Sequence, residues 1–111
     1  MKEIKAVIQP GKLEKLREEL TDHPEFPGMT VTRVEGCGPY ESENRWPLGI
    51  RHELTDFSPK IRIEILAPDQ MVDTIVETIH RITHTGQVGD GVVWVTNAEQ
   101  FHRLRAALTS K

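Results

Sequence analysis

The sequence predicts an α+β domain in which two helices lie on one face of a four-stranded antiparallel sheet. Three observations support this fold class: runs of alternating apolar and polar residues, two amphipathic helical runs, and the order strand, helix, strand, strand, helix, strand. That order is the split βαβ arrangement. With 111 residues, the chain is expected to form one domain over residues 1–111.

The first half of the chain contains a strand, a helix and a second strand. Residues 1–9 alternate apolar with polar side chains and predict the first strand, which ends at Pro10. Residues 12–20 carry leucines at steps of three and four residues, the spacing of an amphipathic helix. Residues 29–35 are rich in β-branched side chains and predict the second strand.

The second half repeats this pattern. Residues 59–65 alternate isoleucine with charged side chains and predict the third strand. The second helix is expected to begin at Pro68 and to carry a broad apolar stripe. Residues 92–96 predict the fourth strand, and Asn97 is expected to cap a short helix in the C-terminal tail, residues 97–111.

A long segment between the second and third strands, residues 38–58, keeps neither a helical nor a strand period. A run of about 20 irregular residues is uncommon in a compact domain and is usually a binding loop or a disordered stretch. Apolar side chains such as Trp46 and Phe57 make this segment less polar than a linker. We therefore expect either a segment that folds onto a partner or ligand, or ordinary packing on the protein's own surface.

A glycine-rich stretch, residues 85–92, joins the second helix to the fourth strand and has three glycines within six residues. Because glycine enters conformations closed to residues with a Cβ, successive N–H groups in such a loop can face an anion such as phosphate. Asp90, between two glycines, is expected to fix the turn through its side chain. The alternative is a plain helix-to-strand connection with a helix-ending glycine at Gly86.

Charge and cysteine content limit the function classes. The formal net charge of -3 and the pI of about 5.9 argue against a nucleic-acid-binding protein that neutralises phosphates. A single cysteine, Cys37, excludes an internal disulfide and is typical of a reducing compartment. Residues 1–9 mix charged with apolar side chains and predict neither a signal peptide nor membrane insertion, so we expect a cytoplasmic protein.

Three blocks of sequence resemble the PII nitrogen-regulatory signalling proteins. They are residues 1–20, with their Ile-Gln-Pro-Gly-Lys-Leu run, residues 28–38 and residues 85–91, and Arg103 and Arg105 follow at the expected place. The resemblance implies a ferredoxin-like homotrimer that binds adenine nucleotides in clefts between subunits. It also implies a regulator and not an enzyme, without a cofactor besides the regulatory nucleotide. The long loop of such a protein docks onto a transporter or an enzyme.

The resemblance assigns specific residues to the nucleotide site. Thr30 resembles the position at the adenine end, while Gly36 and Gly38 flank the base of the long loop over the phosphates. Arg103 and Arg105 resemble the arginines that a neighbouring subunit extends toward the phosphates, a role that guanidinium groups suit. The residues expected at the nucleotide are Thr30, Gly36, Cys37, Gly38, Gly89, Asp90, Gly91, Val92, Arg103 and Arg105.

Departures from the family pattern bear on which nucleotide is bound. Relatives that hold Mg-ATP usually have a lysine after Gly-Asp-Gly and an Arg-Gln pair at the base of the long loop, where this chain has Val92, Pro39 and Tyr40. Charged hydrogen bonds contribute roughly 1.5–3 kcal/mol each, so losing two weakens triphosphate binding by about 3–6 kcal/mol. We therefore expect ADP or AMP to compete well with ATP, and 2-oxoglutarate not to be sensed in the usual way.

Some divergent PII-like proteins belong to inorganic-carbon uptake or carboxysome systems and respond to AMP, ADP or bicarbonate. The resemblance therefore makes bicarbonate a candidate second ligand. The candidate residues for such a small anion are Lys60, Arg62, Arg45 and Arg51. The alternative for each of them is a solvated surface charge.

Two other protein classes are compatible with the same fold. A small acylphosphatase-like hydrolase needs a nucleophile paired with a base, and no recognisable spacing provides one. A trimeric metal-binding or metal-tolerance protein needs a cluster of ligands; His80 and His84 share a helix face, but two imidazoles without a third ligand do not predict a metal site. Fold alone does not separate these classes.

Overall fold

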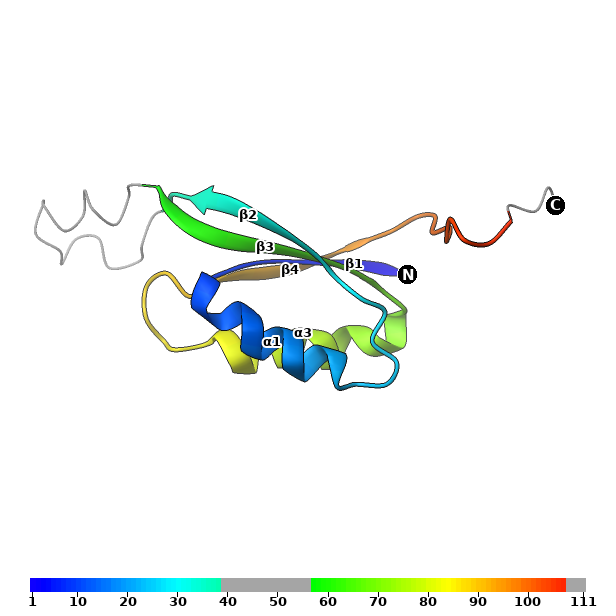
Figure 1. The fold of residues 1–111 in the computed structure, drawn as a ribbon, viewed down its shortest axis with the longest axis horizontal. Helices are drawn as coiled ribbons and strands as arrows, with labels where there is room; N and C mark the ends of the chain where they lie inside the picture. The colour runs from blue at the N-terminus through cyan, green and yellow to red at the C-terminus, as the bar shows by residue number, and fades with distance from the viewer. Residues whose placement is uncertain (39–56, 108–111) are drawn as a thin grey trace, which may run out of the picture.

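The chain forms one antiparallel sheet with two α-helices on one of its faces (Figure 1). The computed structural model describes residues 1–38 and 57–107. In chain order, the elements are β1 (Lys2–Ile8), η1 (Pro10–Lys12), α1 (Leu13–Thr21), β2 (Thr30–Gly36), β3 (Ser58–Ala67), η3 (Asp69–Met71), α3 (Val72–Thr83) and β4 (Gly91–Asn97). The predicted α+β, ferredoxin-like fold class is confirmed. Most of the expected loop at residues 38–58 lies outside the described residues.

Strand register decides which side chains share a face of the sheet. The strand order is β2-β3-β1-β4, and each neighbouring pair is antiparallel. Ala6 at the centre of β1 pairs with Ile63 on one side and Val93 on the other. Because side chains alternate between faces, the isoleucines of β1 and β3 point to one face and the charged residues between them to the other.

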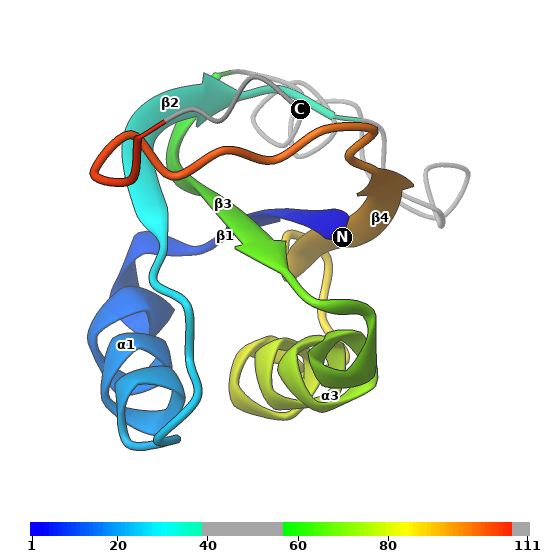
Figure 2. The same ribbon diagram turned by 90° about the vertical axis from the view of Figure 1, so that its right-hand side faces the viewer.

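The core lies between the sheet and the two helices, which sit on the same side of the sheet (Figure 2). Leu16 and Leu20 of α1 and Ile75 and Ile79 of α3 are buried there, so the leucine and isoleucine spacing in the sequence correctly marks the inward faces. Burying each such side chain stabilises the fold by about 1.5–3 kcal/mol. Neither helix of the described chain has the length and apolar character needed to span a bilayer.

The opposite face of the sheet carries charged and apolar side chains. Lys5 lies opposite Glu64 on β3 and Trp94 on β4, and its Nζ is 3.7 Å from the Glu64 carboxylate. Trp94 remains 42% exposed and Val92 60% exposed, so neither belongs to the core of the single chain. Within the described residues, no helix covers this face.

The predicted short helix after Asn97 is wrong for residues 98–107. Asn97 is the last residue of β4, and its side-chain oxygen accepts a hydrogen bond from Lys2. The following segment leaves the sheet without helical structure (Figure 1), and Leu104, expected to share an apolar face with Phe101, is 97% exposed. A short helix needs packing to repay its nucleation cost, and this segment packs on little of its own chain.

Candidate functional site

The glycine-rich loop follows α3 directly and leads into β4. Helix α3 ends at Thr83, whose hydroxyl donates to the Ile79 carbonyl, and its capping residue His84 is extended, with ψ of 125°. Gly86 lies beyond the helix end, so the alternative that it serves as the helix-ending glycine is wrong. Its φ of +83° instead belongs to the loop itself.

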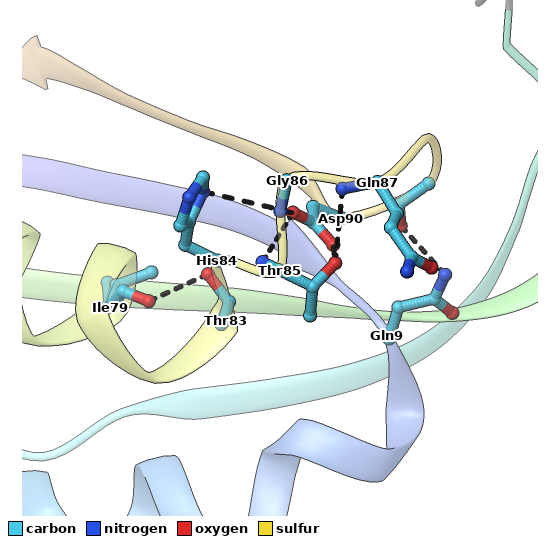
Figure 3. Close-up of polar contacts among 9 residues, drawn as sticks. Gln9, Ile79, Thr83, His84, Thr85, Gly86, Gln87 and Asp90 are labelled. Carbon is cyan, nitrogen blue, oxygen red and sulfur yellow. Dashed lines mark hydrogen bonds and ion pairs between the residues drawn. The ribbon is translucent and has the colours of Figure 1, made fainter.

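Asp90 organises this loop through its carboxylate, as the sequence predicted (Figure 3). Its Oδ2 accepts hydrogen bonds from the backbone N–H of Thr85 at 2.7 Å and of Gly86 at 2.9 Å. Its Oδ1 accepts a further one from the Thr85 hydroxyl. These bonds connect the end of the loop to its start and give it a defined shape.

The same contacts lower the pKa of Asp90 to about 2. The largest cause is the hydrogen bond from the Thr85 hydroxyl, followed by the one from the Thr85 backbone N–H. The Gly86 N–H and the nearby His84, whose Nδ1 is 3.9 Å from Asp90 Oδ2, act in the same direction. Donors that bind the charged form favour ionisation, so Asp90 is a carboxylate at neutral pH.

Two further glycines are required by the path of the loop into β4. Gly89 has φ of +97° and Gly91 has φ of +113°, both in the left-handed region that favours glycine. A Cβ added at Gly91 would lie 1.9 Å from the Val7 carbonyl oxygen on β1. Because Gly91 has no Cβ, the start of β4 can pair with β1 at this short distance.

Two side chains from other strands reach the loop at Gly89. The Gly89 carbonyl accepts hydrogen bonds from Gln9 Nε2 at 2.8 Å and from Lys60 Nζ at 3.2 Å. The stem of Lys60 also lies against Gly36, where an added Cβ would be 3.1 Å from its Cγ. The end of β2, the start of β3, the end of β1 and the glycine-rich loop thus meet at one end of the sheet (Figure 1).

The structure brings together only part of the predicted nucleotide site within one chain. Gly36 is the last residue of β2, at the end of the sheet near the glycine-rich loop; Cys37, which is exposed, and Gly38 follow it. Thr30 lies at the opposite end of β2, where it pairs with Glu64. Val92 presents an exposed apolar side chain beside the loop, on the face opposite the helices.

The two predicted arginines do not reach the loop of their own chain. Arg103 and Arg105 follow the end of β4 that lies away from the glycine-rich loop (Figure 1). The Arg103 guanidinium lies 5.1 Å from the centre of the Phe101 ring, and both arginines are exposed. Within the described part of the chain, these arginines and the glycine-rich loop therefore do not form one site.

Two of the candidate small-anion residues, Lys60 and Arg62, lie two positions apart on the same face of β3. Lys60 lies at the glycine-rich loop, whereas Arg62 lies further along β3, opposite Val7 of β1 and Thr32 of β2. Arg45 and Arg51 lie outside the described residues, as do Pro39 and Tyr40.

His80 of α3 and His84, the extended residue after the helix, stack with ring centres 5.0 Å apart, so the expectation that both lie on one helix face is wrong for His84. They line a cavity of about 120 Å³ together with Asp90 and the start of β4. Among residues 1–38 and 57–107, no group of three or more histidine, cysteine or carboxylate side chains is placed to hold a metal ion.

Sequence reasoning missed Gln9. A glutamine directly after a strand gives no local signal of a contact, and its partner Gly89 lies 80 residues away. Only the register that places the end of β1 beside the start of β4 would have indicated the contact.

Acid is expected to loosen the loop in a defined pH range. The folded-state pKa of Asp90, about 2, lies below the unfolded value of roughly 3.9, so its contribution to stability is complete above about pH 4. That contribution is lost as the pH falls from about 4 to 2. NMR titration of the Thr85 and Gly86 amides should follow a midpoint near 2, and the Asp90→Asn variant should lack the transition. A midpoint near 4 would contradict the hydrogen-bonded carboxylate.

Comparison with known proteins finds one family match over most of the chain. The family model described as Nitrogen regulatory protein P-II matches residues 1–107. The Nitrogen regulatory protein P-II 1 of Escherichia coli strain K12 is 42% identical over 105 residues, covering 95% of this chain and 92% of that protein. The Nitrogen regulatory protein P-II of Klebsiella oxytoca is 41% identical and that of Haemophilus influenzae 38% identical, with the same coverage. This chain therefore belongs to the P-II family of nitrogen regulatory signalling proteins.

Proposed function

We propose that this P-II family member is a homotrimeric regulator that binds adenine nucleotides in clefts between its subunits. The observation that carries the proposal is the loop at residues 85–91, shaped by Asp90 and adjoining Gly36 and Lys60 at one end of the sheet. Backbone N–H groups of a glycine-rich loop are suited to phosphate oxygens, and an ammonium group beside them adds a cation.

Two features of the single chain support assembly with neighbouring copies: arginines far from the loop and an uncovered sheet face. Arg103 and Arg105 lie beyond the far end of β4, out of reach of their own loop. The face with Trp94 and Val92 is uncovered and partly apolar, as expected of a surface that copies of the chain enclose. In the proposed trimer, each loop receives the arginines of a neighbour.

Nucleotide preference follows from the exposed side chain of Val92. A valine offers no charge to a terminal phosphate, so ATP gains little over ADP or AMP from this position. We expect calorimetric titrations to give dissociation constants for ATP and ADP within roughly tenfold of each other. Addition of 2-oxoglutarate should not tighten ATP binding. An ATP affinity about a hundredfold above that of ADP, increased further by 2-oxoglutarate, would contradict this preference.

The regulated process in this proposal is nitrogen or inorganic-carbon metabolism in the cytoplasm. Residues 38–58 would dock onto a transporter or a metabolic enzyme according to the nucleotide bound, and the protein itself would not catalyse a reaction. Bicarbonate is the proposed small anion for Lys60, Arg62, Arg45 and Arg51. Repeating the titrations with bicarbonate tests this, because a bound anion at Lys60 should change the affinity for the nucleotide.

Thermal shifts separate the proposed regulator from the two other classes. Stabilisation by AMP, ADP or ATP supports the regulator, since a ligand that binds only the folded state raises its stability. Stabilisation by divalent metal ions alone would favour the metal-binding class. Turnover of an acyl phosphate would favour the hydrolase.

A further inference from the structure

The carbonyl of Gly89 is held by two side chains from two different strands. Gln9, directly after β1, donates to it at 2.8 Å, and Lys60 of β3 donates at 3.2 Å. Figure 3 shows Gln9 approaching the loop from the side of the sheet. A Cβ added at Gly89 would lie 3.0 Å from Gln9 Nε2, so the Gln9 amide sits directly against this glycine.

We propose that Gln9 is a positioning residue for the glycine-rich loop, setting its affinity for the phosphates of the nucleotide. A trans peptide is planar, with its C=O and N–H pointing in opposite directions, so holding the Gly89 carbonyl also holds the Asp90 N–H, which donates to the Gln87 carbonyl at 3.4 Å. Gly89 has φ of +97° and no side chain of its own to restrict rotation. The contact from Gln9 is the shortest of the hydrogen bonds on this peptide and restricts its rotation from outside the loop. The ligand class in this inference rests on the proposed function.

Gln9 and Lys60 have different parts in this arrangement. Lys60 carries a charge on a long, flexible stem, and an incoming phosphate attracts its ammonium group away from a neutral carbonyl. Gln9 is neutral and has no charge-assisted partner in an anion, so it keeps its bond to Gly89 when the ligand is bound. Gln9 therefore holds the loop with and without ligand, whereas Lys60 moves from the Gly89 carbonyl to the phosphate when the ligand binds.

Substitutions at Gln9 test the hydrogen bond separately from packing. Gln9→Met keeps an unbranched side chain of similar length without a donor, and it should weaken ADP binding by roughly three- to tenfold, the value of one hydrogen bond. Gln9→Lys restores a donor and adds a positive charge beside the proposed phosphate site, so it should bind ADP at least as tightly as the unsubstituted protein. Gln70→Met is the matched control, because Gln70 is an exposed glutamine of η3, which precedes α3, whereas the glycine-rich loop follows α3.

Amide hydrogen exchange of the ligand-free protein provides a second readout that needs no nucleotide. Gln9→Met should speed exchange in residues 86–90 while exchange in the core strands stays unchanged, which also shows that the variant is folded. Lys60→Met should speed loop exchange further in the ligand-free Gln9→Met background. With ADP bound, the Lys60 substitution should leave exchange of the Asp90 amide unchanged.

The two measurements distinguish failure of this inference from failure of the proposed function. ADP affinity and loop exchange that are both unchanged in Gln9→Met would overturn the positioning role, even if the unsubstituted protein binds ADP. If Gln9→Met speeds loop exchange but the unsubstituted protein binds no adenine nucleotide, Gln9 still anchors the loop. The proposed nucleotide site and the effect of Gln9 on its affinity would then both be rejected. Equal weakening by Gln9→Met and Gln9→Lys would also overturn it, because a hydrogen-bond donor would then not matter.

Discussion

Gly91→Ala is expected to destabilise the protein by about 3 kcal/mol or more, the largest effect of any substitution considered. The added Cβ would lie 1.9 Å from the Val7 carbonyl oxygen and 3.2 Å from the Ile8 Cα, both backbone atoms of β1. The φ of +113° adds strain for any residue with a side chain. Relief requires β4 to move away from β1. Urea unfolding monitored by circular dichroism measures the loss in the free energy of unfolding.

Alanine substitutions at two other glycines distinguish the effect of the steric clash from that of the backbone strain. Gly28 has a similar φ of +106° but nothing within 4 Å of an added Cβ, so Gly28→Ala reports the strain alone. Gly11 has open space and no left-handed φ, so Gly11→Ala should change stability by no more than about 1 kcal/mol, in the stabilising direction. If Gly91→Ala costs no more than Gly28→Ala, the register of β4 on β1 is incorrect.

Arg103→Ala is expected to weaken every phosphorylated ligand by roughly ten- to a hundredfold, the value of a charged hydrogen bond. The melting temperature should stay almost unchanged, because Arg103 is exposed in a segment outside the core. Calorimetry with AMP and ADP measures the effect. Arg17→Ala is a suitable control, since Arg17 is an exposed arginine of α1 paired with Glu14. Unchanged affinities in Arg103→Ala would exclude the proposed cleft.

Mixed assemblies can show which subunit supplies the arginine. Arg103→Ala removes the guanidinium group, while Asp90→Ala removes the carboxylate that shapes the loop. If the arginine comes from a neighbour, unfolding and refolding the two variants together should restore some intact clefts and part of the ADP binding. Mixtures that bind no better than the separate variants would contradict a shared site.

The sequence by itself determined the class of fold and the residues of the core. Alternation at Ile61, Ile63 and Ile65 marks a strand because side chains alternate across a sheet, and the structure buries all three. The spacing of Leu16 and Leu20 marks the inward face of α1 for the equivalent helical reason. The role of Asp90 was also predictable, since its partners Thr85 and Gly86 lie within five residues.

The tertiary structure alone decided what holds the loop from outside and where the tail runs. Gln9 and Lys60 meet at Gly89 because β1 pairs with both β3 and β4, and that register joins residues far apart in the chain. The helix expected after Asn97 had local signals but nothing to pack against in the described chain. Periodicity reports the environment of each residue along its own element, whereas contacts between elements depend on strand order and register, which no local pattern contains.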